Sequence, residues 1–232
     1  MSNTNIIENN ITNNLLNLPK SFKYFFFLNL VMAVALSASV ITARKIVSIG
    51  PISFPCCNII FSLLTFPITD VISEIWGKNY ASKSVLFAFC AQALFVFFIQ
   101  VSIFLPYNDS WPDQSMYVEI LGTGPRILLA SLVAFLTAQM WDVYIYAKLK
   151  KSTKGKYLWL RNNVSTISSQ MINSFLLISI AYYGTHSIIE LFLGSILIKV
   201  TIAILDTPLV YLAVSYITKN IDTKTLAYTE YE

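Results

Sequence analysis

Six long stretches of apolar sequence, nearly free of charged residues, constrain this chain more than any other feature. A transmembrane α-helix needs about 20 predominantly apolar residues. Of the 232 residues, 56% are hydrophobic and only 12% are charged, about half the charge content of an ordinary soluble domain. The predicted spans lie at 24–43, 54–69, 84–108, 127–147, 162–183 and 191–218.

We therefore expect an all-α membrane protein, a bundle of six transmembrane helices embedded in a lipid bilayer. The membrane domain is predicted at 22–218. A disordered or peripheral cytosolic tail at 1–21 precedes it, and a cytosolic C-terminal tail at 219–232 follows it.

The charges of two connections predict how the bundle is oriented. The connection 148–161 carries six basic residues and no acidic one, so the positive-inside rule assigns it to the cytoplasm. The connection 108–125 carries three acidic residues and no basic one, which suits the opposite side. Both termini are then cytoplasmic. Arg44 and Lys45, at the predicted outer end of the first span, are exceptions: either they line a polar pathway or the first connection is shallower than expected.

The composition and the motif search argue against two other classes of protein. The net charge of +4 comes from Lys and Arg in a few connections, without a basic stripe, so no nucleic acid partner is expected. Cys56, Cys57 and Cys90 lie in apolar stretches, and His186 is expected at the surface. No metal-ligand cluster, nucleophile elbow or phosphate loop is present, so we expect no enzyme, no metal and no cofactor.

Ionisable residues within the predicted spans are the first candidates for a functional site. An ionised side chain at the centre of a bilayer costs at least about 2.5 to 3.5 kcal/mol. Asp70 and Glu74 are four residues apart on the second span, so they share one helix face near the predicted cytoplasmic end. Like charges at this spacing repel and can recruit a cation; solvation at the membrane interface is the alternative interpretation.

The fourth and fifth spans each carry a polar ridge. Gln139, Asp142 and Tyr146 are spaced i, i+3, i+7, with Trp141 beside them; alternatively, Asp142 marks the headgroup region. The ridge on the fifth span extends over 11 rises of about 1.5 Å, roughly 16 Å, and so reaches the membrane midplane. Helix packing through polar pairs, at about 0.6 kcal/mol each, is the alternative. The members of the ridge on the fifth span are Asn162, Thr166, Ser169, Gln170 and Asn173.

The last span contains Lys199 and Asp206, seven residues and therefore about 10 Å apart along one face. At that separation they cannot pair directly, so each is expected to meet another helix or a ligand. Interhelical ion pairs that only hold the bundle together are the alternative. Thr207 and Pro208 follow, and a proline inside a helix frees a backbone carbonyl about one turn earlier.

Three motifs in three different spans resemble the queuosine precursor transporter family, also called the vitamin uptake-like family. The run 66–77, FPITDVISEIWG, resembles its FP-x-T-D-x-x-x-E-x-Y-G signature, with Trp76 in place of the usual Tyr. The run 161–174 resembles its R-x-x-x-S-T-x-x-S/G-Q-x-x-D-S helix, with Asn173 in place of Asp. Lys199 followed by 207–211, TPLVY, resembles its last-span pattern.

The resemblance implies a six-helix inner (plasma) membrane protein that imports 7-deazaguanine precursors of the tRNA base queuosine. Such a base presents two adjacent donors beside a carbonyl acceptor, and it has two flat faces. A carboxylate can accept both donors, an amide can serve the carbonyl, and aromatic rings can cover the faces. Because Asn173 both donates and accepts, it can still read a neutral purine-like edge, but an amide in place of the acid argues against a proton-coupled or cation-pairing role there.

On this interpretation, Glu74 or Asp70 reads the guanine-like edge, and Lys199 balances the carboxylates of the empty site. Asp206 suits the amine of an aminomethyl derivative, and Trp76, Trp141 or Tyr211 stacks on the ring. The full set of expected substrate-binding residues is Asp70, Glu74, Trp76, Asp142, Thr166, Gln170, Asn173, Lys199, Asp206 and Tyr211.

Two modes of action stay open at this point. The chain is a self-sufficient secondary transporter, or it is the substrate-binding subunit of an energy-coupling-factor vitamin-type transporter, which also needs an ATPase and a coupling subunit. The sequence leaves open whether it assembles as a homo-oligomer.

Overall fold

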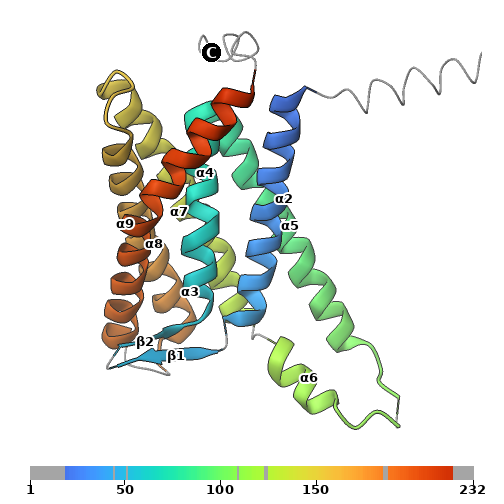
Figure 1. Cartoon of the computed structure of the whole chain (residues 1–232). Coiled ribbons are helices and arrows are strands. Elements are labelled where there is room, and N and C mark those ends of the chain that lie inside the picture. Colours follow the sequence, from blue (N-terminus) through green and yellow to red (C-terminus); the bar gives the residue numbers. More distant parts are fainter. Residues whose placement is uncertain are drawn as a thin grey trace, which may run out of the picture.

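Six helical spans form the part of the protein that the structure describes, as the apolar stretches predict (Figure 1). The computed structural model describes residues 19–43, 45–50, 52–108, 110–122, 125–184 and 188–221. All six spans are long and apolar enough to cross a membrane, which confirms the expected all-α bundle. They are α2 (Lys20–Thr42), the joined helices α3 (Cys57–Ile60), η1 (Phe61–Thr65) and α4 (Phe66–Ile75), α5 (Lys78–Phe104), α7 (Pro125–Ser152), α8 (Leu158–Tyr182) and α9 (Ile188–Asn220).

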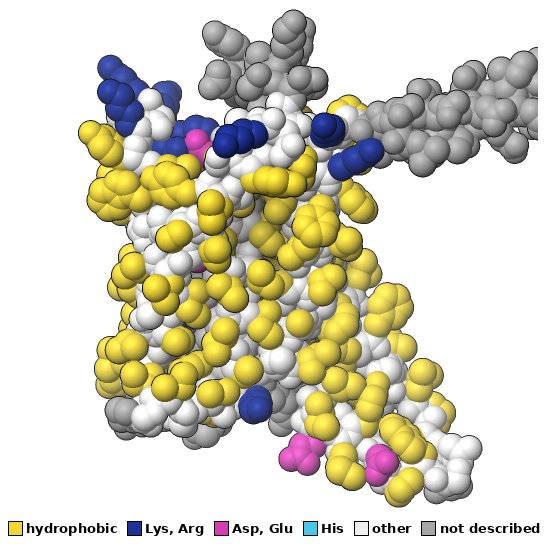
Figure 2. All heavy atoms as spheres, viewed as in Figure 1, with side chains coloured by type: hydrophobic (Ala, Val, Ile, Leu, Met, Phe, Trp, Pro, Cys, Tyr) yellow, Lys and Arg dark blue, Asp and Glu magenta, His cyan; other side chains and the backbone are white. Residues whose placement is uncertain are grey.

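The two ends of the bundle differ in charge. Helix α2 begins, helix α9 ends and α7 connects to α8 at one end, which we call the basic end (Figure 1). Lys and Arg side chains gather there, acidic side chains lie beside α6 (Gln114–Leu121) at the other end, and hydrophobic side chains cover the flanks (Figure 2). This asymmetry follows the charge pattern of the sequence. That the basic end faces the cytoplasm stays a prediction.

The first connection is a β-hairpin, which the sequence analysis did not predict. Strands β1 (Ile46–Ile49) and β2 (Ile52–Pro55) pair antiparallel, with Gly50 in the turn at φ +60°. Helix α9 packs on β2 closely, since a Cβ at Gly194 would lie 2.4 Å from the Ser53 carbonyl oxygen. The second span therefore begins at Cys57, later than the expected Phe54. We call this end of the bundle the hairpin end.

The span formed by α3, η1 and α4 is the most enclosed of the six. Of its most apolar 18-residue stretch, 61% is buried, against 17% to 44% for the other spans. Helix α4 packs against α2, α5, α7 and α9. Polar residues on α4 therefore meet other helices, whereas large apolar residues elsewhere face outward, as expected for a protein whose solvent is lipid.

Some expectations fall outside the described residues. Arg44 and His186 are among them, as is nearly all of the two predicted tails. Lys20 and Ser21 belong to the described α2, and Lys219 belongs to α9.

Candidate functional site

Glu74 lies in a fully paired ionic cluster, which we define as Glu74, Tyr146, Lys150 and Arg161. Its Oε1 is 2.7 Å from Arg161 Nη2, and its Oε2 accepts from Arg161 Nε at 3.0 Å and from the Tyr146 hydroxyl at 2.8 Å. Lys150 Nζ donates to the Glu74 backbone carbonyl at 2.8 Å. These contacts tie α4 to α7 and α8 at the basic end. A two-pronged arginine–carboxylate contact of this kind is among the stronger polar interactions.

The Arg161 guanidinium is satisfied on its other side as well. Its Nη1 donates to the carbonyls of Gly155 and Lys156 at 2.9 and 3.0 Å, and its side chain is only 2% exposed. Because Gly155 and Lys156 belong to the α7–α8 connection, this side chain also holds that connection against the bundle. The ionic cluster therefore joins α4, α7 and α8 at the basic end.

Asp70, one helical turn before Glu74, lies in a different environment. We define the carboxyl cluster as Asp70, Asp142 and Asp206, which are 0%, 0% and 2% exposed. Thr166 Oγ1 donates to Asp70 Oδ2 at 3.1 Å, and Ser169 Oγ donates to Asp142 Oδ1 at 3.0 Å. The carboxyl groups of Asp70 and Asp142 lie within hydrogen-bonding reach of each other.

Asp206 completes this cluster from α9. Its side chain lies close to Asn162 of α8, and it is near enough to the other two carboxyl groups for their charges to interact. One oxygen of each carboxyl group, namely Asp70 Oδ1, Asp142 Oδ2 and Asp206 Oδ1, is buried without a hydrogen-bond partner. Within the described part of the chain, the ion pairs join Lys150 and Arg161 to Glu74 and reach none of these three. The carboxyl cluster thus has fewer hydrogen-bond donors than acceptor oxygens, and no ion pair in the described residues compensates its negative charge.

Towards the hairpin end, the polar ridge of α8 continues below the carboxyl cluster. All five of its predicted members are buried. Gln170 Nε2 donates to Ser62 Oγ at 3.3 Å, while its Oε1 has no partner. Lys199 Nζ donates to Asn173 Oδ1 at 2.8 Å and to Ser174 Oγ at 3.0 Å. As expected, Lys199 meets another helix, but these two partners are neutral side chains.

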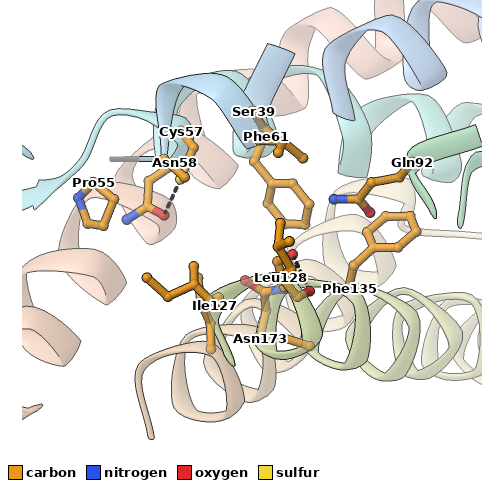
Figure 3. Close-up of a pocket in the computed structure, with 15 residues that line it drawn as sticks. Ser39, Pro55, Cys57, Asn58, Phe61, Gln92, Ile127, Leu128, Phe135 and Asn173 are labelled. Carbon is orange, nitrogen blue, oxygen red and sulfur yellow. Dashed lines mark hydrogen bonds between the residues drawn. The ribbon is translucent and has the colours of Figure 1, made fainter. Parts of the chain in front are cut away.

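A small cavity of about 60 Å³ lies on the hairpin side of this ridge, room for a few water molecules. Helices α2, α5, α7 and α8 and the start of the second span line it. Figure 3 shows the Phe61 ring between the amides of Asn58 and Gln92, with Phe135 nearby, and Asn173 reaches the same space. Gln92 Oε1 is buried without a partner. Asn173 belongs to the polar ridge of α8 and binds Lys199, so the cavity that it lines adjoins this ridge.

The matched region of a known protein family includes every one of these polar residues. A family model described as "Putative vitamin uptake transporter" matches residues 55–213. The chain belongs to this family. The match confirms the resemblance that the three motifs indicate, and the transporter is accordingly a multi-pass membrane protein without enzymatic activity.

Two curated relatives agree with this assignment. A "Probable queuosine precursor transporter" of Bacillus subtilis (strain 168) is 30% identical over 160 residues, which cover 67% of this chain and 69% of the relative. A "Queuosine precursor transporter" of Escherichia coli (strain K12) is 25% identical over 177 residues, covering 73% and 74%. No solved structure matches the transporter significantly.

Three aromatic residues that the sequence suggests for stacking lie away from the buried polar ridge of the transporter. Trp76 Nε1 donates to Ser21 Oγ at 3.0 Å, on the α2 side of α4. Tyr211 is 43% exposed, and its hydroxyl accepts from the Trp159 backbone N–H at 3.1 Å. Trp141 is 41% exposed. The structure does not bring these rings together with Asp70.

The aromatic rings beside the polar groups are instead Phe61 and Phe135, whose centroids are 6.1 Å apart. Lys199 Nζ lies 5.6 Å from the centroid of the Phe61 ring. Sequence reasoning missed both residues because the chain has 16 phenylalanines, and nothing local distinguishes these two.

The π-helical turn η1 is a second feature that sequence reasoning missed. It supplies Phe61 to the cavity and Ser62 to Gln170, and the Thr65 hydroxyl donates back to the Phe61 carbonyl. Short π-helical segments within α-helices are frequent at functional sites. One signal was available: Pro67 has no N–H to donate to the carbonyl one turn earlier, and such a gap loosens the helix just before it.

Proposed function

We propose that this transporter imports a queuosine precursor, a 7-deazaguanine base, across the inner (plasma) membrane for tRNA modification. The observation that carries the proposal is the carboxyl cluster, whose three unpartnered oxygens lie in the membrane-spanning core. Unpartnered acceptors at such a position are costly unless a ligand with donors fills them. The names of the two relatives support the same substrate class.

Asp70 is our candidate for reading the guanine-like edge. A carboxylate can accept both the ring N–H and the exocyclic amine. Of the two acidic residues on α4, Glu74 already accepts from Arg161 and Tyr146, whereas Asp70 Oδ1 is unpartnered. Asp70 is therefore the better acceptor for a new ligand.

Amides and carboxyl groups around Asp70 suit the rest of the ligand. In this proposal Gln170 and Asn173 orient the ring, Gln170 through its unpartnered Oε1, and the Phe61 and Phe135 rings offer apolar surface to its faces. Asp206 suits the cationic amine of an aminomethyl derivative.

Substrate access is proposed from the hairpin end. The cavity lies on that side of the α8 ridge, and the ionic cluster joins α4, α7 and α8 at the basic end. If the basic end is cytoplasmic, as its charge predicts, this conformation is poised to receive substrate from outside. Inward release then requires the Glu74–Arg161 contact to separate.

Uptake into liposomes that contain only the purified protein tests both substrate and mode of action. We expect uptake of a labelled 7-deazaguanine precursor without partner subunits, as a self-sufficient transporter requires. Transport that appears only with an ATPase and a coupling subunit would instead support the energy-coupling alternative. No uptake of the nitrile, aminomethyl or cyclopentenediol form under either condition would overturn the substrate class.

Competition between two ligands, measured in the wild type and in two variants, tests whether Asp70 binds the guanine-like edge of the precursor. An analogue that lacks the exocyclic amine should compete at least about tenfold less well, because one carboxylate contact is lost. Asp70→Asn should remove this discrimination, and Asp113→Asn, an exposed acidic residue before α6, is the matched control. If the unmodified precursor and the analogue without the amine compete equally well in the wild type, Asp70 does not bind this edge of the base.

A further inference from the structure

The carboxyl cluster contains more negative charge than its surroundings can compensate. Asp70 and Asp142 are fully buried, and their carboxyl groups lie within hydrogen-bonding reach of each other. Thr166 and Ser169 each give them one hydroxyl donor. Two ionised carboxylates in contact at low dielectric repel strongly, so such pairs hold a cation or a proton between them.

The basic residues near the pair are occupied elsewhere. Arg161 and Lys150 bind Glu74, and Arg161 also binds backbone carbonyls of the α7–α8 connection. Lys199 donates to Asn173 and Ser174 and lies about 10 Å along α9 from Asp206. The described structure therefore gives the pair no protein cation as a counter-charge.

The titratable groups that face the pair come from four helices. Helix α4 itself contributes Glu74, α7 contributes Tyr146, and α9 contributes Asp206. Helix α8 contributes Arg161, which is bound to Glu74. The lysines of the two remaining neighbours lie in the first two turns of those helices, at the basic end; they are Lys20 and Lys23 of α2 and Lys78 and Lys83 of α5.

We infer that the Asp70–Asp142 pair is a proton-binding site, and that one proton moves through it with each substrate molecule. The inference rests on the proposed function. A metal ion is the less suitable occupant, because no group of three acidic, His or Cys side chains in the described ranges is arranged to hold one. A proton needs only two oxygen atoms, and the pair presents Asp70 Oδ1 and Asp142 Oδ2 without other partners.

The proton balance of the cycle is simple. A proton from the hairpin side converts one carboxylate to a carboxylic acid, which donates a hydrogen bond to the other. The pair then carries a single negative charge and still offers acceptors to the two donors of a guanine-like edge. When the ionic cluster opens, substrate and proton leave on the basic side, and the pair returns empty. No bond other than the O–H bond forms or breaks.

The test measures protons and substrate together in liposomes that contain the purified protein and a trapped pH-sensitive dye. Adding labelled precursor outside should acidify the interior, with about one proton entering for each precursor molecule. In Asp142→Asn this ratio should fall at least tenfold, whatever the remaining rate. Asp113→Asn, whose side chain is exposed outside the bundle, should keep the wild-type ratio.

A binding measurement covers the case in which Asp142→Asn moves no substrate. Wild-type affinity for the precursor, measured in detergent, should weaken by up to tenfold per pH unit as the pair loses its proton. The affinity of Asp142→Asn should not depend on pH over that range. A pH-independent wild type would refute the site.

The controls separate this inference from the proposed function. A wild type that exchanges labelled for unlabelled precursor but moves no protons, or needs a sodium gradient, overturns the proton site alone. A wild type that neither binds nor exchanges the precursor overturns the proposed function.

Discussion

Two acidic residues one turn apart on α4 lie in opposite environments. Glu74 is bound by Arg161, Tyr146 and Lys150, so its charge is compensated and each carboxylate oxygen has a partner. Asp70 receives one hydroxyl bond and faces another carboxyl group. Helical spacing alone therefore does not separate a structural charge from one that is available to a ligand. The partners that other helices supply determine which of the two charges is compensated.

The depth of each residue in the bundle explains this difference. Glu74 lies at the basic end, within reach of Arg161 and Lys150, which flank the α7–α8 connection. Asp70 lies deeper, where neighbouring helices offer hydroxyl, amide and carboxyl groups. We therefore expect the ionic cluster to determine stability and closure, and the carboxyl cluster to determine binding and coupling.

The largest effect on stability is expected from Arg161→Gln. Removing one partner of a buried ion pair costs about 3–5 kcal/mol, because the other charge stays buried without compensation. Unfolding of the purified protein in detergent micelles measures it. The control is Lys150→Gln, which removes a more exposed partner 3.7 Å from Glu74 Oε1 and should cost about 0–1 kcal/mol. Equal losses for both variants would remove the distinction between a central and a peripheral contact in the ionic cluster.

Thr166→Val should have the next largest effect. The substitution keeps the shape of the side chain but leaves Asp70 Oδ2 without its hydroxyl donor, and an unsatisfied buried acceptor costs about 1–3 kcal/mol. Unfolding in the same micelles measures the loss. Thr201→Val, on the exposed side of α9, removes only a bond to its own helix and should change stability by less than about 0.5 kcal/mol. A Thr166→Val protein as stable as wild type would show that this bond contributes nothing.

Trp76→Phe should have a smaller effect and leave transport intact. The variant loses the hydrogen bond to Ser21 but keeps an aromatic ring against Phe25, so we expect a loss of about 1 kcal/mol. Because Trp76 contacts α2 and lies outside both clusters, uptake should stay within about twofold of wild type. A strong loss of uptake with normal unfolding would instead restore Trp76 as a stacking residue.

Asp70→Asn should have the smallest effect on stability, in the stabilising direction. The substitution removes a buried charge that has no cation, so the free energy of unfolding should stay within about 1 kcal/mol of wild type or rise. Precursor uptake should nevertheless fall sharply. Glu74→Gln is the matched change one turn away, and it should destabilise the protein because it breaks the contact with Arg161. If Asp70→Asn destabilises the protein as much as Glu74→Gln, the two environments are equivalent and the comparison fails.

Several features of the fold and of the candidate site could be predicted because they depend on local periodicity. The spans follow from apolar length, and the ridge on α8 follows from offsets that repeat with the helix turn. The β-hairpin was missed because 46–55 is a short apolar segment, and segments of this length are ambiguous between strand and helix. Arg161 belongs to one of the motifs, yet it was assigned no partner, since its contact with Glu74 joins residues 87 positions apart.

The sequence by itself determined six membrane spans, their charge asymmetry and the presence of ionisable groups inside them, because lipid penalises every exception to an apolar composition. Only the tertiary structure decided which of these groups are paired. Pairing depends on the rotation and depth of each helix relative to its neighbours, and those are set by packing between distant segments. Glu74 and Asp70 have the same spacing pattern and the same chemistry, but one turn of α4 separates a neutralised ion pair from an uncompensated carboxyl group.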